Sequence, residues 1–96
     1  MEFKVLIAET AIAGLKEIVE FVAHDDQDAA ARVGEKLVQN AMGLATMPER
    51  FPFHDSGCGI RKMSSSPFLI FYTVDNREAV VNVLHFWHGA RRPPRF

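Results

Sequence analysis

Two β-prone runs separated by a four-residue turn constrain the fold of this chain most strongly. Residues 68–74 (Phe-Leu-Ile-Phe-Tyr-Thr-Val) and 79–87 (Ala-Val-Val-Asn-Val-Leu-His-Phe-Trp) are rich in β-branched and aromatic side chains, which favour strands. Residues 75–78, Asp-Asn-Arg-Glu, begin with two residues that favour turns by bonding to nearby backbone groups. The sequence therefore predicts an antiparallel hairpin, and a hairpin alone cannot bury its apolar face.

The N-terminal half has a helical period instead. The first apolar stripe has the spacing of one helix face and follows a candidate N-cap, Thr10: Ile12, Leu15, Ile18, Val19 and Val22. Asp25 and Asp26 predict the end of this helix and the N-cap of another. The second stripe runs to about Thr46: Ala30, Val33, Leu37, Ala41 and Leu44. Pro48 ends it, because proline lacks an N–H and disfavours helix in the preceding residue.

The remaining segments complete a compact order of elements. Residues 2–7 alternate like a first strand, and residues 60–63 like a short one. Residues 48–59 contain two prolines and two glycines and predict a loop. The expected fold class is α+β in the order β-α-α-β-β-β, an antiparallel sheet with an N-terminal helical hairpin packed on one face. Residues 1–96 are expected to form a single domain, because a chain of this length buries one core.

Composition narrows the classes of function. The formal net charge is −1, which argues against a generally basic nucleic-acid coat, so contacts with polyanions would need a local patch. No apolar run approaches the roughly 20 residues that span a bilayer, and the N-terminus lacks the pattern of a secretion signal, so we expect a cytoplasmic protein. His54 and the single cysteine, Cys58, lack paired ligand spacing, and we expect no metal and no cofactor.

The chemistry-bearing side chains gather at the C-terminal end. There the apolar run breaks into His88, Gly89, Ala90 and two arginines, which places an imidazole and fixed positive charge at the edge of a strand. Strict alternation would put His85 and Trp87 on one face with Val81 and Val83, and His88 on the other face. The candidates for binding a partner or nucleic acid are basic and aromatic: Arg91, Arg92, Arg95, Tyr72 and Trp87.

Four short segments, together with the order of elements, carry a resemblance to a known family: Leu44–Pro48, Gly59–Lys62, Phe68–Tyr72 and Trp87–Arg91. In these features the chain resembles the ParE/RelE superfamily of toxins from type II toxin–antitoxin, or plasmid stabilisation, modules. The resemblance implies a small cytoplasmic toxin that a cognate antitoxin neutralises. RelE-like members cut messenger RNA on the ribosome, whereas ParE-like members inhibit DNA gyrase.

The residues at the RelE-like catalytic positions favour the ParE-like branch. Ribonucleases of the superfamily often carry arginine where this chain has Leu69 and His85, and tyrosine where it has Gly89. A neutral imidazole holds a phosphate poorly compared with a guanidinium. The catalytic residues that the resemblance leaves for RNA cleavage are His88, Arg61 and Arg91. We therefore expect a gyrase-binding toxin; the alternatives are a ribosome-dependent ribonuclease and a non-toxic relic that binds its antitoxin.

An antitoxin would bind this fold as an extended or helical segment. A helical hairpin beside a small sheet leaves grooves along its helices and an exposed sheet edge, and both accept such peptides. Met42 and Met47 add apolar area near the second helix that a partner helix would cover. Homodimerisation is left open.

Overall fold

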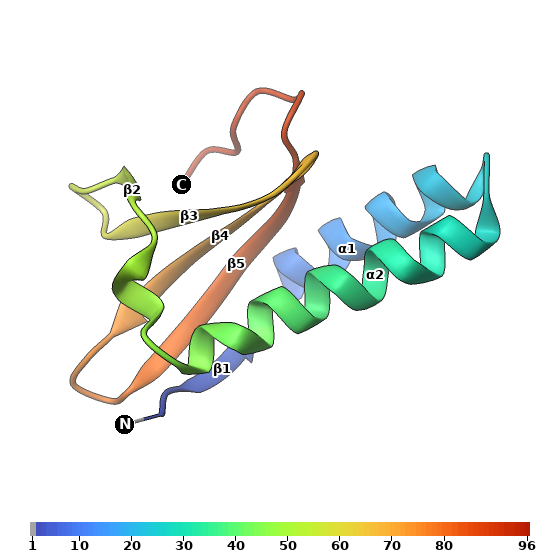
Figure 1. The fold of residues 1–96 in the computed structure, drawn as a ribbon. Helices are drawn as coiled ribbons and strands as arrows, with labels where there is room; N and C mark the ends of the chain where they lie inside the picture. Colours follow the sequence, from blue (N-terminus) through green and yellow to red (C-terminus); the bar gives the residue numbers. More distant parts are fainter. Residues whose placement is uncertain (1) are drawn as a thin grey trace.

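The computed structural model describes residues 2–96, which form two helices and five strands (Figure 1). Along the chain they are β1 (Lys4–Ile7), α1 (Glu9–Ala23), α2 (Gln27–Met42), β2 (Phe53–Asp55), β3 (Ile60–Ser65), β4 (Phe68–Asp75) and β5 (Val80–His88). Two 3-10 turns, Gly43–Ala45 and Pro48–Arg50, connect α2 to β2. The predicted fold class, α+β with a helical hairpin beside a sheet, is confirmed.

The sheet is mixed, with the strand order β1-β5-β4-β3-β2, and the helices lie along one of its faces (Figure 1). Three strand pairs are antiparallel as expected, but β1 runs parallel to β5, with Lys4 opposite Val80 and Ile7 opposite Val83. Strands β1 and β5 are separated by almost the whole length of the chain, so no hairpin turn determines the direction of β1. The expectation of an antiparallel sheet was wrong for this strand alone.

Strand β2 lies inside the segment predicted to be a loop. Its three residues pair with the start of β3 through a β-bulge, with Phe53 opposite Arg61 and Asp55 opposite Ile60. A strand this short has no alternation to read, and its neighbours include proline and glycine. The loop prediction missed it for that reason.

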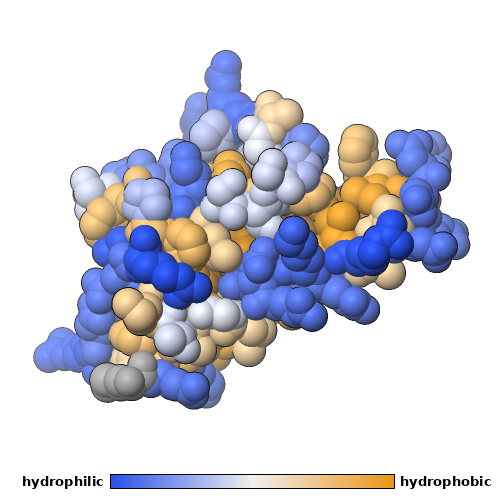
Figure 2. Space-filling view, viewed as in Figure 1, coloured by the Kyte–Doolittle hydropathy of each residue, from blue (hydrophilic) through white to orange (hydrophobic). Residues whose placement is uncertain are grey.

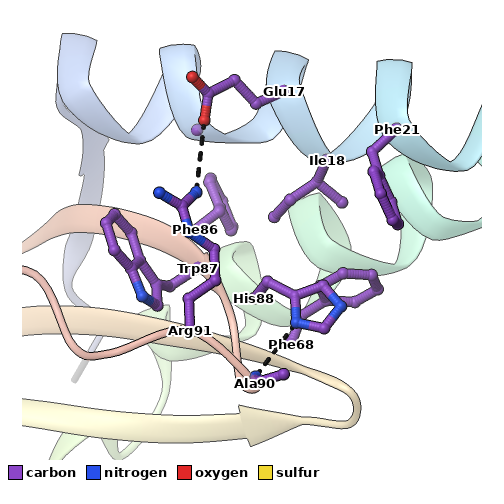
Figure 3. Close-up of a pocket in the computed structure, with 10 residues that line it drawn as sticks. Glu17, Ile18, Phe21, Phe68, Phe86, Trp87, His88, Ala90 and Arg91 are labelled. Carbon is purple, nitrogen blue, oxygen red and sulfur yellow. Dashed lines mark hydrogen bonds and ion pairs between the residues drawn. The ribbon is translucent and has the colours of Figure 1, made fainter.

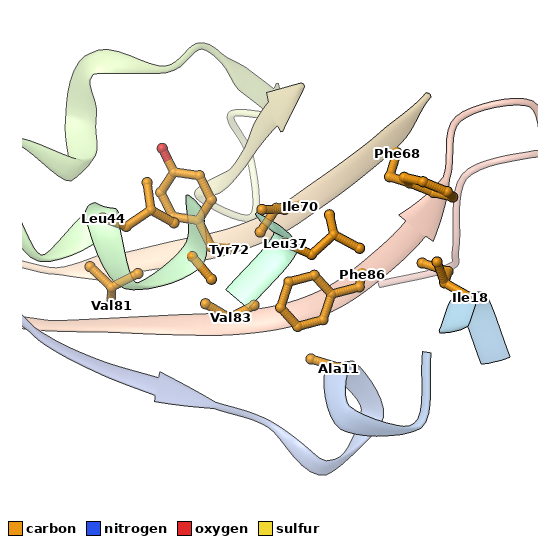
Figure 4. Close-up of a cluster of buried hydrophobic side chains, with 11 residues drawn as sticks. Ala11, Ile18, Leu37, Leu44, Phe68, Ile70, Tyr72, Val81, Val83 and Phe86 are labelled. Atoms are coloured by element: carbon orange, nitrogen blue, oxygen red, sulfur yellow. The ribbon is translucent and has the colours of Figure 1, made fainter. Parts of the chain in front are cut away.

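The core fills the space between the helical hairpin and the sheet (Figure 4). The apolar stripe predicted for the second helix is confirmed as buried: Ala30, Leu37, Ala41 and Leu44 are buried and Val33 packs against the core. The predicted end of this helix near Thr46 was wrong, because α2 ends at Met42 and Leu44 lies in the 3-10 turn that follows. The first stripe is wrong at Ile12, whose side chain is 44% exposed, whereas Ala11 is fully buried. Helix α1 thus turns a face of small residues toward the sheet.

Helix α1 approaches β5 very closely. A Cβ atom added at Gly14 would lie 2.6 Å from the carbonyl oxygen of Phe86, a separation that real Cβ atoms do not show. Thr10 does not cap the helix as predicted: α1 begins at Glu9 with Ala8 as its N-cap, and the Thr10 hydroxyl donates to the Leu84 carbonyl (2.8 Å). At the second helix, Asp26 is the N-cap as expected and accepts from the amide of Ala29 (3.1 Å).

Leu84 is the extra residue of a β-bulge in β5. Phe71 of β4 pairs with His85, but the next residue, Tyr72, pairs with Val83, so Leu84 has no partner. The bulge reverses the alternation, and Phe86 consequently joins Val83 in the core. The prediction that His85 shares a face with Val83 was therefore wrong, and His88 lies on the helix side of the sheet.

We predict that Gly14→Ala destabilises the protein although alanine favours helix by about 1 kcal/mol over glycine. The added methyl forces α1 away from the Phe86 carbonyl, and overpacking of this kind costs roughly 1–3 kcal/mol. The measurement is the free energy of unfolding in urea. Gly43→Ala is the matched control, because no atom lies within 4 Å of its added Cβ. A Gly14→Ala protein at least as stable as the parent would show that this contact does not limit the packing.

Candidate functional site

A largely apolar groove of about 390 Å³ lies between α1 and the ends of β4 and β5 (Figure 3). Its lining, which we call the α1 groove, consists of Gly14, Glu17, Ile18, Phe21, Phe68, Phe86, Trp87, His88, Ala90 and Arg91. Phe21 is 70% exposed, an unusual position for so large an apolar side chain. Apolar side chains also reach the surface over the helical hairpin in Figure 2. An open apolar groove with charged groups at its rim suits a protein segment better than a small polar substrate.

His88 forms part of the wall of this groove. Its ring lies edge-on between Phe68 (5.4 Å between ring centroids) and Phe21 (6.2 Å). Its Nδ1 atom accepts a hydrogen bond from the amide of Ala90 (3.1 Å), which orients the ring (Figure 3). These contacts place the imidazole among aromatic rings.

Arg91 spans the mouth of the α1 groove. Its guanidinium pairs with the Glu17 carboxylate of α1 (3.8 Å) and lies 4.8 Å from the centre of the Trp87 ring (Figure 3). Both ionic partners are exposed, so the pair contributes little to stability. An entering partner can therefore separate Arg91 from Glu17 at small cost.

Arg61 is committed to the loop that precedes β2. Its guanidinium donates to the carbonyl oxygens of Glu49 (3.1 Å) and Phe51 (2.6 Å), and it also pairs with the Glu49 carboxylate (3.6 Å). The face of the guanidinium lies 3.9 Å from the centre of the Phe53 ring. A guanidinium held on all these sides has a structural role.

Tyr72 is fully buried beneath the same loop. Its hydroxyl donates to the Pro48 carbonyl (2.6 Å), and its ring belongs to the core (Figure 4). Burial raises the pKa of this phenol, an effect that the charges of Arg61 and Arg50 partly oppose. The hydroxyl thus donates its hydrogen bond to the backbone, and the burial of the side chain disfavours Tyr72 as a contact residue for a partner.

The structure does not bring the three candidate catalytic residues together. Arg61 pairs with Tyr72 of β4, whereas His88 pairs with Phe68, four residues along the same strand. At about 3.3 Å per residue, these positions are about 13 Å apart along the sheet. Arg91 lies with His88 at the α1 groove. Arg61 lies on the same face of the sheet, the one that the helices cover, but at its other end.

The other predicted contact residues lie on the chain that follows β5. Arg92 and Arg95 are exposed and make no ion pair within residues 2–96. The Trp87 indole donates to the Arg92 carbonyl (2.9 Å), so this side chain holds the start of the tail as well as lining the α1 groove. Both arginine side chains are thus accessible to solvent, and Trp87 holds the backbone at Arg92.

An aromatic cluster that sequence reasoning missed occupies the sheet face opposite the helices. His54, Phe71 and His85 come from three different strands, and the Phe96 ring packs against all three. Burial lowers the pKa of His85. The bulge at Leu84 hid this cluster, because strict alternation grouped His85 with the core valines.

Residues 2–96 contain neither a cluster of metal ligands nor a membrane-spanning helix. No three His, Cys, Asp or Glu side chains in this part of the chain converge well enough to hold a metal ion. None of the described helices is long and apolar enough to cross a membrane.

Comparison with known proteins establishes the family. A sequence model of the ParE toxin of the type II toxin–antitoxin system parDE matches residues 5–93. The chain belongs to this family. It is therefore a type II toxin of the ParE/RelE superfamily.

Solved structures show the same fold at low sequence identity. The RelBE2 toxin–antitoxin complex from Mycobacterium tuberculosis contains a chain with a TM-score of 0.71 and 19% identity, over 92% of this toxin and 99% of that chain. The chromosomal ParDE system from P. aeruginosa contains one with a TM-score of 0.74 and 15% identity, over 91% and 96%. A comparison with curated proteins gives no significant match.

We predict that Tyr72→Phe lowers the free energy of unfolding by about 1–3 kcal/mol, because the buried Pro48 carbonyl loses its only side-chain donor. Denaturation in urea measures this change. Toxicity per folded molecule should stay unchanged, since the hydroxyl serves the fold. A toxin that keeps its stability but loses its toxicity would instead assign Tyr72 to the functional site.

Proposed function

We propose that this toxin acts in the cytoplasm by binding DNA gyrase and not by cutting messenger RNA. The separation of the candidate catalytic residues carries the proposal. Cleavage of RNA without a metal needs an acid–base group and cations around one phosphate. Here Arg61 is held by backbone carbonyls about 13 Å along the sheet from His88. Inhibition by binding requires no such cluster.

The α1 groove is the proposed site for the cognate antitoxin. Its apolar floor suits the apolar face of a partner helix, and its exposed Phe21 provides an anchor at the rim. The two similar structures come from a RelBE2 toxin–antitoxin complex and a ParDE toxin–antitoxin system, which supports an antitoxin as a partner of this toxin. An antitoxin segment that orders on binding would displace the weak Arg91–Glu17 pair.

The test of gyrase binding is a supercoiling assay with purified gyrase and the purified toxin. We predict inhibition that rises with toxin concentration and that persists in His88→Ala, because no proton transfer is involved. Induction of the toxin alone should cause DNA damage signalling while translated messages stay intact. Cuts in those messages that disappear with His88→Ala would establish the ribonuclease instead. Absence of any growth defect would support the non-toxic relic.

The test of the α1 groove compares two exposed apolar residues on one helix. We predict that Phe21→Ala weakens antitoxin binding about 10- to 100-fold, as expected for removing a buried phenyl ring from an interface. Ile12→Ala is the matched control, since Ile12 is also exposed on α1 but does not line the groove. Titration calorimetry with the antitoxin encoded beside the toxin measures both affinities. Equal losses for the two variants would place the antitoxin elsewhere.

A further inference from the structure

Phe71 is completely buried although it points away from the helices. Its neighbours Ile70 and Tyr72 face the core, so Phe71 lies on the open face of the sheet. It is covered there by side chains remote in sequence. The His54 ring lies 5.0 Å from it and the Phe96 ring 5.3 Å, measured between centroids.

The chain after β5 folds back so that its end lies beside β2 and β3 (Figure 1). The Phe96 ring packs into the space between His54, Phe71 and His85, which we call the aromatic nest; the centroid distances are 5.8, 5.3 and 5.5 Å. The tail thus supplies the aromatic ring that fills the nest.

Apart from the Phe96 ring, little holds the tail to the rest of the protein. Within the described chain, residues 93–96 make no hydrogen bond, and Pro93 and Pro94 have no N–H to donate. The last anchor before them is the Arg92 carbonyl, which accepts from Trp87. Phe96 itself remains 47% exposed. A contact of this kind exchanges readily with a competing ring.

We propose that the aromatic nest is a binding site for an aromatic side chain on an acidic segment of a protein partner, and that Phe96 occupies it in the free toxin. The site is distinct from the α1 groove, which lies on the helix side. The proposal goes beyond gyrase inhibition and stands whichever target the toxin has.

The geometry of the nest selects a side chain over a nucleobase. All three nest rings meet Phe96 at angles between 60° and 69°, which is an edge-to-face arrangement. A phenyl ring fits such a cage, whereas bases bind aromatic residues chiefly by parallel stacking. Burial lowers the pKa of His85, which favours its uncharged imidazole as part of an apolar wall of the nest.

The charges around the nest select an acidic segment. Lys62 lies directly opposite Phe71 on the neighbouring strand, and Arg92 is exposed at the anchored start of the tail, so both cations stay when Phe96 leaves the nest. The nearby carboxylate is Asp55, next to His54, which accepts from the amide of Gly57 (3.0 Å). The two cations outnumber this carboxylate, so the net charge of the three groups is positive and attracts a negatively charged partner.

The experiment uses an isotope-labelled toxin that ends after Arg92, which empties the nest. The probes are three hexapeptides: residues 91–96 themselves, the same peptide with every arginine replaced by glutamate, and that acidic peptide with alanine in place of phenylalanine. NMR titration should show shifts at His54, Phe71 and His85. We expect the acidic phenylalanine peptide to bind several-fold more tightly than the native tail, and the alanine peptide not to bind. The intact chain should bind about tenfold more weakly, because Phe96 competes from within the molecule.

Two single substitutions in the untruncated chain test the same proposal if truncation disturbs the fold. Phe96→Ala should open the nest and bind the acidic peptide like the truncated chain, whereas Ile12→Ala, at an exposed apolar residue of α1 outside both the nest and the α1 groove, should bind like the parent. Equal binding by open and intact proteins, or shifts confined to the α1 groove, would overturn the proposal. Stronger shifts at the nest with a single-stranded oligothymidine would also overturn it and assign the site to nucleic acid.

Discussion

The close contact between α1 and β5 is the constraint on which the rest of this structure depends. Gly14 lets the helix backbone approach the Phe86 carbonyl, and Thr10 satisfies the carbonyl of Leu84, which the bulge leaves outside the strand ladder. A helix this close to a strand leaves room only for small residues at the contact, so the larger apolar side chains lie farther along. The α1 groove, with Ile18 and Phe21 on one wall, is the consequence of that packing.

The polar residues that a ribonuclease would use make contacts with other parts of this protein. Arg61 and Tyr72 both hold the Pro48–Phe51 segment against the sheet through its backbone carbonyls. His88 and Arg91 lie at the α1 groove and interact with aromatic rings. The hydrogen-bonding groups of Arg61 and Tyr72 are satisfied inside the protein and are not free to stabilise charge on a substrate. These two residues therefore serve the packing of the toxin, which agrees with an inhibitor that works by binding.

The two faces of the sheet carry different surfaces, and the segment after β5 touches both. Its first part, with Arg91, closes over the α1 groove, and its last residue fills the aromatic nest on the opposite face. Trp87 stands between them, since it lines the groove and also binds the Arg92 carbonyl.

By itself, the sequence determined the order of every element except β2, the helical hairpin, the core stripe of the second helix, the Asp26 cap and membership of the superfamily. These features depend on local periodicity, turn chemistry and short motifs, which can be read directly from the sequence. Only the tertiary structure decided the direction of β1, the bulge at Leu84, the true role of Thr10 and the aromatic nest. Each of these arises from contacts between residues far apart in sequence. A single extra residue in a strand reverses which side chains face the core, and no local sequence pattern indicates such a bulge.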